Sequence, residues 1–375
     1  MRCLFFILLL FVLWFFSPAQ EAAAGAEALA SSVSLSGYIS SSYHLGSGSR
    51  SYPFALSPAN QNAFSLDVVG LSFQRPLDEW LYDSGFRLDL WVGPDASLLE
   101  TSSADTSIAI RQAFVDLRIP LFDPRVTGAA RSVDLRVGTF DSPLGFESLD
   151  RHLNPHHTHS WGFTIEPSLH TGLLAMYPGV DAMENGESDY LFSLGVANSI
   201  DPRINGAPVN SDRKTLLSGV TWLLSDAFGP LSGTALSVGY INGRTLAGDE
   251  PVQNLYLATG LPIDSPKWDA ALTYDSRMMQ GGGNDDSVLG AYLSYRASEK
   301  TSLNLRGELF QDGAKLFSSE SLAEQSDGYG LTATLDYRLS ENVLSRAEWR
   351  WDHTEARVND RHDSQTWHWN LVYEF

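Results

Sequence analysis

The chain has 375 residues, and its 45 Asp and Glu residues outnumber its 25 Lys and Arg residues, giving a formal net charge of −20. Such an acidic chain lacks the basic surface that a nucleic-acid backbone requires, so no nucleic-acid partner is expected. Hydrophobic residues make up 43% of the sequence, enough for a folded protein, and the single cysteine excludes an intramolecular disulfide bond.

A secretory signal peptide is expected at residues 1–24. Arg2 precedes an apolar run from Leu4 to Phe16, and Ala22-Ala23-Ala24 provides small residues for cleavage. As a helix this run rises only about 20 Å, against ~30 Å for the hydrocarbon core of a bilayer. A membrane anchor is therefore the less favoured alternative, and residues 25–375 are expected to form the mature domain.

After the leader, apolar and polar residues alternate with a period of two, which is typical of β-strands with two unlike faces. The alternation predicts strands at 33–43, 63–75, 84–93, 108–119, 131–140, 170–178, 189–198, 213–224, 233–243, 252–260, 267–277, 287–297, 301–310, 327–339, 343–353 and 365–375. The segment 63–75 changes phase near Gly70, which predicts a β-bulge there.

Two architectures fit alternating strands of this kind. A soluble sandwich or propeller buries the apolar face, whereas a transmembrane barrel turns that face toward lipid. Segments of about ten residues, charged residues on the polar face and Trp and Tyr near strand ends favour the barrel. We therefore predict an all-β, antiparallel transmembrane barrel of about 16 strands.

The connections support this strand count independently. In an outer-membrane barrel, connections after odd-numbered strands are long external loops and those after even-numbered strands are short periplasmic turns. The predicted odd connections include 44–62, 141–169 and 311–326, whereas the even ones include 261–266 and 340–342. A slip of one strand would have exchanged long and short connections partway along the chain.

The third and longest external connection, 141–169, carries the most distinctive sequence. The segments that stand out are Gln112-Ala113-Phe114-Val115-Asp116-Leu117, Gly138-Thr139-Phe140-Asp141-Ser142-Pro143-Leu144-Gly145-Phe146-Glu147, Asn154-Pro155, Ser160, His170-Thr171-Gly172 and Tyr177. Over about 112–177 the chain resembles the OmpL-like β-barrel porin-2 family of bacterial outer membranes. The resemblance implies a porin-like barrel more firmly than it implies any particular solute.

Charged residues suggest how this loop narrows a channel. We expect Asp141, Glu147, Asp150 and Arg151 to form the constriction. Arginines on the polar faces of the strands are expected to form the pore wall: Arg87, Arg118, Arg136, Arg306, Arg338, Arg346 and Arg350. Acidic loop against basic wall would create a transverse field that favours polar solutes. These arginines could instead only pair with acids on neighbouring strands. We expect both outcomes, in which most of the arginines pair and a few line the path.

Four histidines, His152, His156, His157 and His159, also lie in this loop. The spacings His152-x3-His156 and His156-x-x-His159 suit a transition metal, but a polar loop is the simpler interpretation, so no metal and no cofactor are expected. Protonation of these residues near pH 6.5 is a further hypothesis, because it would add positive charge to the loop.

The sequence thus predicts an outer-membrane porin for passive diffusion of small hydrophilic solutes or ions, with weak cation preference from acidic external loops. A structural or adhesive barrel is the alternative, and a hydrolase the least favoured, because no Gly-x-Ser-x-Gly motif frames Ser160 or Ser168. Expected partners are membrane lipid, lipopolysaccharide and the barrel-assembly machinery, which would recognise Tyr373 and Phe375. A homotrimer is the candidate assembly.

Overall fold

In the computed structural model, residues 33–47, 62–78, 82–99, 101, 107–121, 132–180, 188–206, 213–246, 250–263, 265–279, 285–312, 326–356 and 360–375 are described. The predicted signal peptide, 1–24, lies outside these residues. The strands are β1 Ser34–Ser47, β2 Phe64–Arg75, β3 Asp83–Val92, β4 Ile108–Pro120, β5 Ser132–Asp141, β6 Leu169–Val180, β7 Ser188–Ala197, β8 Thr215–Leu223, β9 Ala235–Arg244, β10 Pro251–Gly260, β11 Trp268–Met279, β12 Asp286–Arg296, β13 Thr301–Asp312, β14 Ser326–Ser340, β15 Val343–Ala356 and β16 Asp360–Glu374.

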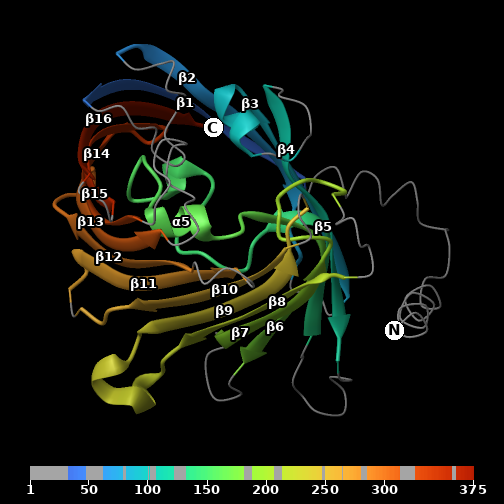
Figure 1. The fold of residues 1–375 in the computed structure, drawn as a ribbon. Helices are drawn as coiled ribbons and strands as arrows, with labels where there is room; N and C mark the ends of the chain where they lie inside the picture. The colour runs from blue at the N-terminus through green and yellow to red at the C-terminus, as the bar shows by residue number, and fades with distance from the viewer. Residues whose placement is uncertain are drawn as a thin grey trace.

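These strands form one closed barrel in which each strand lies antiparallel to its sequence neighbours (Figure 1). Strands β1 and β16 close the ring, with Tyr38 opposite Glu374 and Ser47 opposite Gln365. Closure continues beyond β16, because the backbone N–H and C=O of Phe375 both bond to Gly37 at 2.9 Å. Gly37 is required there, since a Cβ would lie 2.7 Å from the Phe375 ring. The predicted 16-stranded barrel is confirmed.

The alternation separates the two faces of the wall as predicted. On β14, Leu335 is 43% exposed on the outer face, whereas its neighbour Thr334 is 2% exposed inside. On β16, Trp367 and Trp369 are more than half exposed, whereas His368 between them is buried. The outer face is therefore an apolar surface and the inner face carries the polar side chains.

The bulge expected near Gly70 lies three residues earlier, so its predicted position is wrong. The pairing of β1 with β2 shifts between Ser40 and Ser41, which face Val68 and Leu66, so Asp67 is the extra residue. As a result, both Asp67 and Val68 are buried inside the barrel. A second shift, between Asp89 and Leu90 of β3, leaves Arg111 of β4 as the extra residue there.

Short helical segments complete the described structure: α3 Pro94–Leu98, η2 Arg151–Leu153, α5 Trp161–Ile165 and η3 Asp226–Leu231. Within the residues described, no helix is long and apolar enough to cross a membrane. Figure 1 shows α5, in green, inside the ring of strands. The connection between β5 and β6 thus enters the barrel.

Candidate functional site

The connection between β5 and β6, residues 142–168, is here named the inner loop. It turns at Gly145, whose φ of +114° suits glycine and whose missing side chain leaves room for the Glu166 carboxylate. Ser160 caps the N-terminus of helix α5, because its hydroxyl accepts a hydrogen bond from the N–H of Phe163. Because Trp161, Phe163 and most of their neighbours are buried, the inner loop is a packed structure within the barrel.

Glu147 fastens the first part of the inner loop to the wall. Its carboxylate forms an ion pair with Arg306 of β13 at 2.9 Å, and both side chains are buried. It also accepts hydrogen bonds from the Tyr292 hydroxyl at 3.1 Å and from the N–H of Ser160 at 2.8 Å. Glu147 therefore links the wall to both limbs of the loop.

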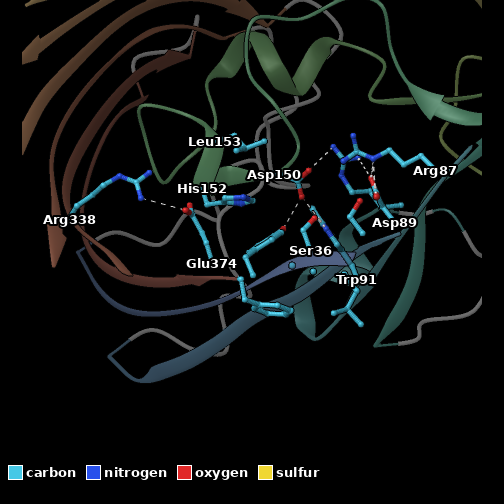
Figure 2. A pocket seen from close by; sticks show the side chains of 16 residues that line it. Ser36, Arg87, Asp89, Trp91, Asp150, His152, Leu153, Arg338 and Glu374 are labelled. Carbon is cyan, nitrogen blue, oxygen red and sulfur yellow. Dashed lines mark hydrogen bonds and ion pairs between the residues drawn. The ribbon is translucent and has the colours of Figure 1, made fainter. Parts of the chain in front are cut away.

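Asp150 forms the second anchor, on the opposite stretch of wall. Its carboxylate pairs with Arg111 at 2.9 Å and accepts hydrogen bonds from the Tyr38 hydroxyl at 2.8 Å and the Trp91 indole N–H at 3.2 Å. Arg111 pairs in addition with Asp141, at 3.0 Å. Figure 2 shows Asp150 pointing toward the Trp91 side of a cavity of about 450 Å³ that lies between the inner loop and the wall.

Three of the predicted wall arginines lie beneath the inner loop. Arg306 donates to the carbonyl of Thr158 at 2.7 Å, Arg346 to that of Asn154 at 2.8 Å, and Arg350 to that of His159 at 2.6 Å. Each of the three side chains is at most 2% exposed. Glu147 and Arg306 are in direct contact, so this pair does not supply the separated charges of the expected transverse field.

The other predicted arginines are more accessible and are paired along the wall. Arg87 pairs with Asp89, Arg118 with Asp134, Arg136 with Asp116 and Arg338 with Glu374, at 2.7–3.4 Å. Arg151, the predicted basic member of the constriction, pairs with Asp95 of α3 at 3.6 Å. The lumen in the described part of the barrel therefore carries closely compensated charges.

The loop histidines do not form a polar external loop, as the simpler interpretation held. His156 is buried against Thr334, with 2.7 Å between its Nδ1 and the hydroxyl, and His159 stacks on Phe163 with ring centroids 3.8 Å apart. Burial lowers the pKa of His159 to about 3, and it lowers the pKa of His156 well below its usual value. Protonation of these two residues near pH 6.5 is therefore not expected while the inner loop is docked.

Glu166, at the end of α5, is a titratable anchor that the sequence did not single out. Burial raises its pKa well above the ordinary value, and the carboxylates of Asp275 and Glu147 raise it further. A hydrogen bond between the Glu166 and Asp275 carboxyl groups also favours the protonated form of Glu166. Docking of the inner loop therefore favours the protonated form of Glu166.

The raised pKa of Glu166 makes docking of the inner loop depend on pH. Because the docked-state pKa of Glu166 is raised, docking is strongest below its ordinary pKa and weakens as pH rises through the raised value. Channel conductance should therefore rise with pH, and Glu166→Gln, which stays neutral, should remove that rise. Single-channel recordings across an alkaline pH series provide the measurement. The same pH response in the Gln variant would exclude Glu166 as its source.

Two groups of residues in the site were not predicted from the sequence. Arg111 sits at the β-bulge, so Arg111 and Gln112 both turn inward and the strict alternation hides one of them. His44 and His368 stand directly opposite each other across the β1–β16 closure. The sequence assigned His368 to a polar face but gave no signal that it meets His44.

A closed 16-stranded barrel with its third external connection anchored inside it is the geometry to compare with known proteins. The family model described as "Putative beta-barrel porin-2, OmpL-like" matches residues 32–368. The chain belongs to this porin family. Its barrel is accordingly that of an outer-membrane channel, and the resemblance stated from 112–177 is confirmed over nearly the whole chain.

Other solved structures share the fold of this porin at low sequence identity. The anion-selective porin from Comamonas acidovorans aligns with a TM-score of 0.60 and 10% identity, covering 92% of this chain and 99% of that one. Salmonella typhi OmpF in complex with daunomycin aligns with a TM-score of 0.60 and 12% identity, covering 92% of this chain and 97% of that one. The trimer form of Vibrio cholerae OmpT aligns with a TM-score of 0.57 and 10% identity, covering 92% of this chain and 99% of that one. Comparison with curated proteins gives no match.

Proposed function

We propose that this porin is a water-filled channel for passive diffusion of small hydrophilic solutes, and that the inner loop sets its width. The observation that carries the proposal is the double anchoring of this loop, by Glu147 to Arg306 and by Asp150 to Arg111. Ion pairs from two separated regions of the wall hold the loop across the interior. Such a loop narrows a lumen at a fixed place, as a size filter requires.

The solute path is proposed to follow the wall opposite the buried arginines. Strands β5–β10 and the inner loop enclose a cavity of about 230 Å³. Most of its lining is uncharged and includes Ser142, Pro143, Gly145, Leu174, Met176, Leu191, Ser193, Gly219, Thr221, Ser237 and Tyr256. Only Arg136 and Asp141 add charge to this lining. A path of this composition favours small neutral polar solutes and discriminates weakly by charge.

A size series of sugars tests this function. Liposomes that contain the refolded porin should swell in isotonic monosaccharide, more slowly in disaccharide, and hardly in large oligosaccharides. The rate of swelling should depend on the size of the solute rather than on its charge. Swelling equal to that of protein-free liposomes would instead favour the structural or adhesive alternative.

A weak cation preference is proposed for the mouth of the channel. The arginines of the lumen are compensated by neighbouring carboxylates, whereas the whole chain carries a net charge of −20. Acidic external segments concentrate cations within about one Debye length, ~10 Å at 0.1 M salt. Reversal potentials in a KCl gradient should show K⁺ preference at low salt that fades as salt rises. Anion preference at low salt would refute this proposal.

The remaining partners are proposals of the same kind. Export by the signal peptide at 1–24, contact with lipid and lipopolysaccharide, and recognition by the barrel-assembly machinery fit an outer-membrane barrel. The OmpT trimer form, which shares the fold, supports a homotrimer as the assembly to test.

Phe375 is proposed to act in assembly together with Tyr373, and its contacts give the reason. It extends the β16–β1 closure by two backbone hydrogen bonds, and its ring covers Gly37. Deleting Phe375 should reduce the yield of inserted barrel, whereas Phe375→Trp should retain most of it. Fractionation of membranes with heat-modifiable gel mobility measures folded barrel. A normal yield after the deletion would contradict the assembly role.

A further inference from the structure

Three histidines from distant segments meet inside the barrel, where the ring of strands closes. His44 lies on β1, His368 lies opposite it on β16, and His157 reaches them from the inner loop. One ring nitrogen of each lies within 4.8 Å of the others. His157 is 1% exposed, and the two strand histidines are 6% exposed each.

The hydrogen bonds of the two strand histidines turn their Nδ1 atoms toward each other, whereas Nε2 of His157 has no partner among the described residues. Nε2 of His44 bonds to the Ser42 hydroxyl at 2.7 Å, and Nε2 of His368 bonds to the Thr366 hydroxyl at 2.9 Å. Their Nδ1 atoms form a hydrogen bond with each other, 2.5 Å long. His157 Nε2 is buried and has no hydrogen-bond partner among the described residues. An unpartnered buried nitrogen is costly. A cation bound by all three rings would satisfy His157 Nε2 and would replace the hydrogen bond between the two strand histidines.

The groups around the cluster resemble the outer support of a metal site. The Ser42 hydroxyl that holds His44 donates in turn to the Asp67 carboxylate at 2.5 Å, so a carboxylate orients the ring through one hydroxyl. The Glu348 carboxylate holds the inner loop at this point, accepting a hydrogen bond from the N–H of His157 at 2.6 Å. Arg151 is a nearby positive charge that would oppose a bound cation, and it is paired with Asp95.

We propose that His44, His157 and His368 bind one transition-metal ion of the Zn²⁺, Cu²⁺ or Ni²⁺ class, which clamps the inner loop to the β1–β16 closure. Imidazole nitrogens suit these ions, and three of them with one open position for water complete a tetrahedral Zn²⁺ shell. Zn–N bonds of ~2.0–2.1 Å place neighbouring nitrogens about 3.3 Å apart, so small ring rotations convert the observed cluster into a ligand set. Burial and Arg151 also lower the pKa of His157, which keeps its ring neutral, as a ligand must be.

This ligand set differs from the spacings that the sequence suggested within the inner loop. His156 and His159 are held by other groups, Thr334 and Phe163, and only His157 joins the cluster. The two strand ligands are 324 positions apart in the chain, so no local motif could reveal them. Barrel closure alone brings them together.

The test is metal binding by the refolded full-length porin. Isothermal titration with Zn²⁺ should give one site per chain, and Cu²⁺ electron paramagnetic resonance should show nitrogen coordination. His157→Gln is the most informative variant, because it changes the inner loop and leaves both strands intact. It should weaken Zn²⁺ binding at least about tenfold, as should His368→Gln.

His353→Gln is the matched control. His353 lies on β15 and bonds to Asp363 at 2.8 Å and to Glu355 at 3.4 Å, so it offers a rival cation site. The proposal expects this variant to bind Zn²⁺ with unchanged affinity. Saturable binding that His353→Gln abolishes and His157→Gln retains would overturn the proposal, as would a wild-type protein with no saturable binding. Heat-modifiable gel mobility confirms that each variant is folded.

Discussion

Deleting residues 149–159 from the inner loop should raise the single-channel conductance at least about twofold. The deleted segment includes Asp150, whose ion pair with Arg111 forms the second anchor, and the carbonyls that cover Arg346 and Arg350. Without it the lumen gains cross-section, and the uncovered arginines become hydrated. The barrel itself should persist, because its strands are paired around the entire ring.

Planar-bilayer recording in KCl measures this change in conductance. Point variants of the inner loop should give smaller changes. Asp150→Asn keeps a hydrogen-bond acceptor but loses the ion pair, so it should give a smaller rise with more frequent fluctuations. Asp269→Asn is the matched control, since Asp269 and Arg296 form an exposed pair 4.0 Å apart that contributes little. Unchanged conductance after the deletion would mean that the inner loop does not border the solute path.

The second large effect concerns the orientation of the strands. Val238 of β9 is 45% exposed on the outer face, and its neighbour Ser237 points inward and lines the cavity along β5–β10. Val238→Arg should lower the free energy of unfolding in lipid by about 2–4 kcal/mol, because it places a charge near the bilayer midplane. Ser237→Arg places the same side chain in the water-filled lumen and should cost much less.

Urea unfolding of the two variants in liposomes provides the comparison. The Ser237 variant carries a second signature, since its guanidinium would reduce conductance and shift selectivity toward anions. Equal destabilisation by both substitutions would contradict the assigned faces of β9.

The sequence predicted the fold well because a bilayer imposes a strict two-residue period on a barrel strand. Leu335 and Thr334 illustrate this, since adjacent positions fall on opposite faces as expected. The two β-bulges interrupt this two-residue alternation. At Asp67 and Arg111 one extra residue turns two consecutive side chains inward, which hid the partner of Asp150 and moved the expected bulge from Gly70.

The candidate site could be predicted only in part. The sequence identified the inner loop, its acids Glu147 and Asp150 and the wall arginine Arg306, but it did not show which residues hold which acid. Those partners, including Arg306 and Tyr38, come from strands on separate parts of the ring, and only closure of the barrel sets their distances. The same reason explains why His44 and His368 were missed and why the loop histidines were assigned to an external surface.

The central claim is that the barrel remains open to water beside its inner loop. Single-channel recording of the refolded wild-type porin in a planar bilayer, in concentrated KCl, tests this claim most directly. We expect discrete conductance steps with a linear current–voltage relation, at a conductance lower than that of the 149–159 deletion. Folded protein that inserts into the bilayer and carries no current would contradict it, because the inner loop would then be a plug.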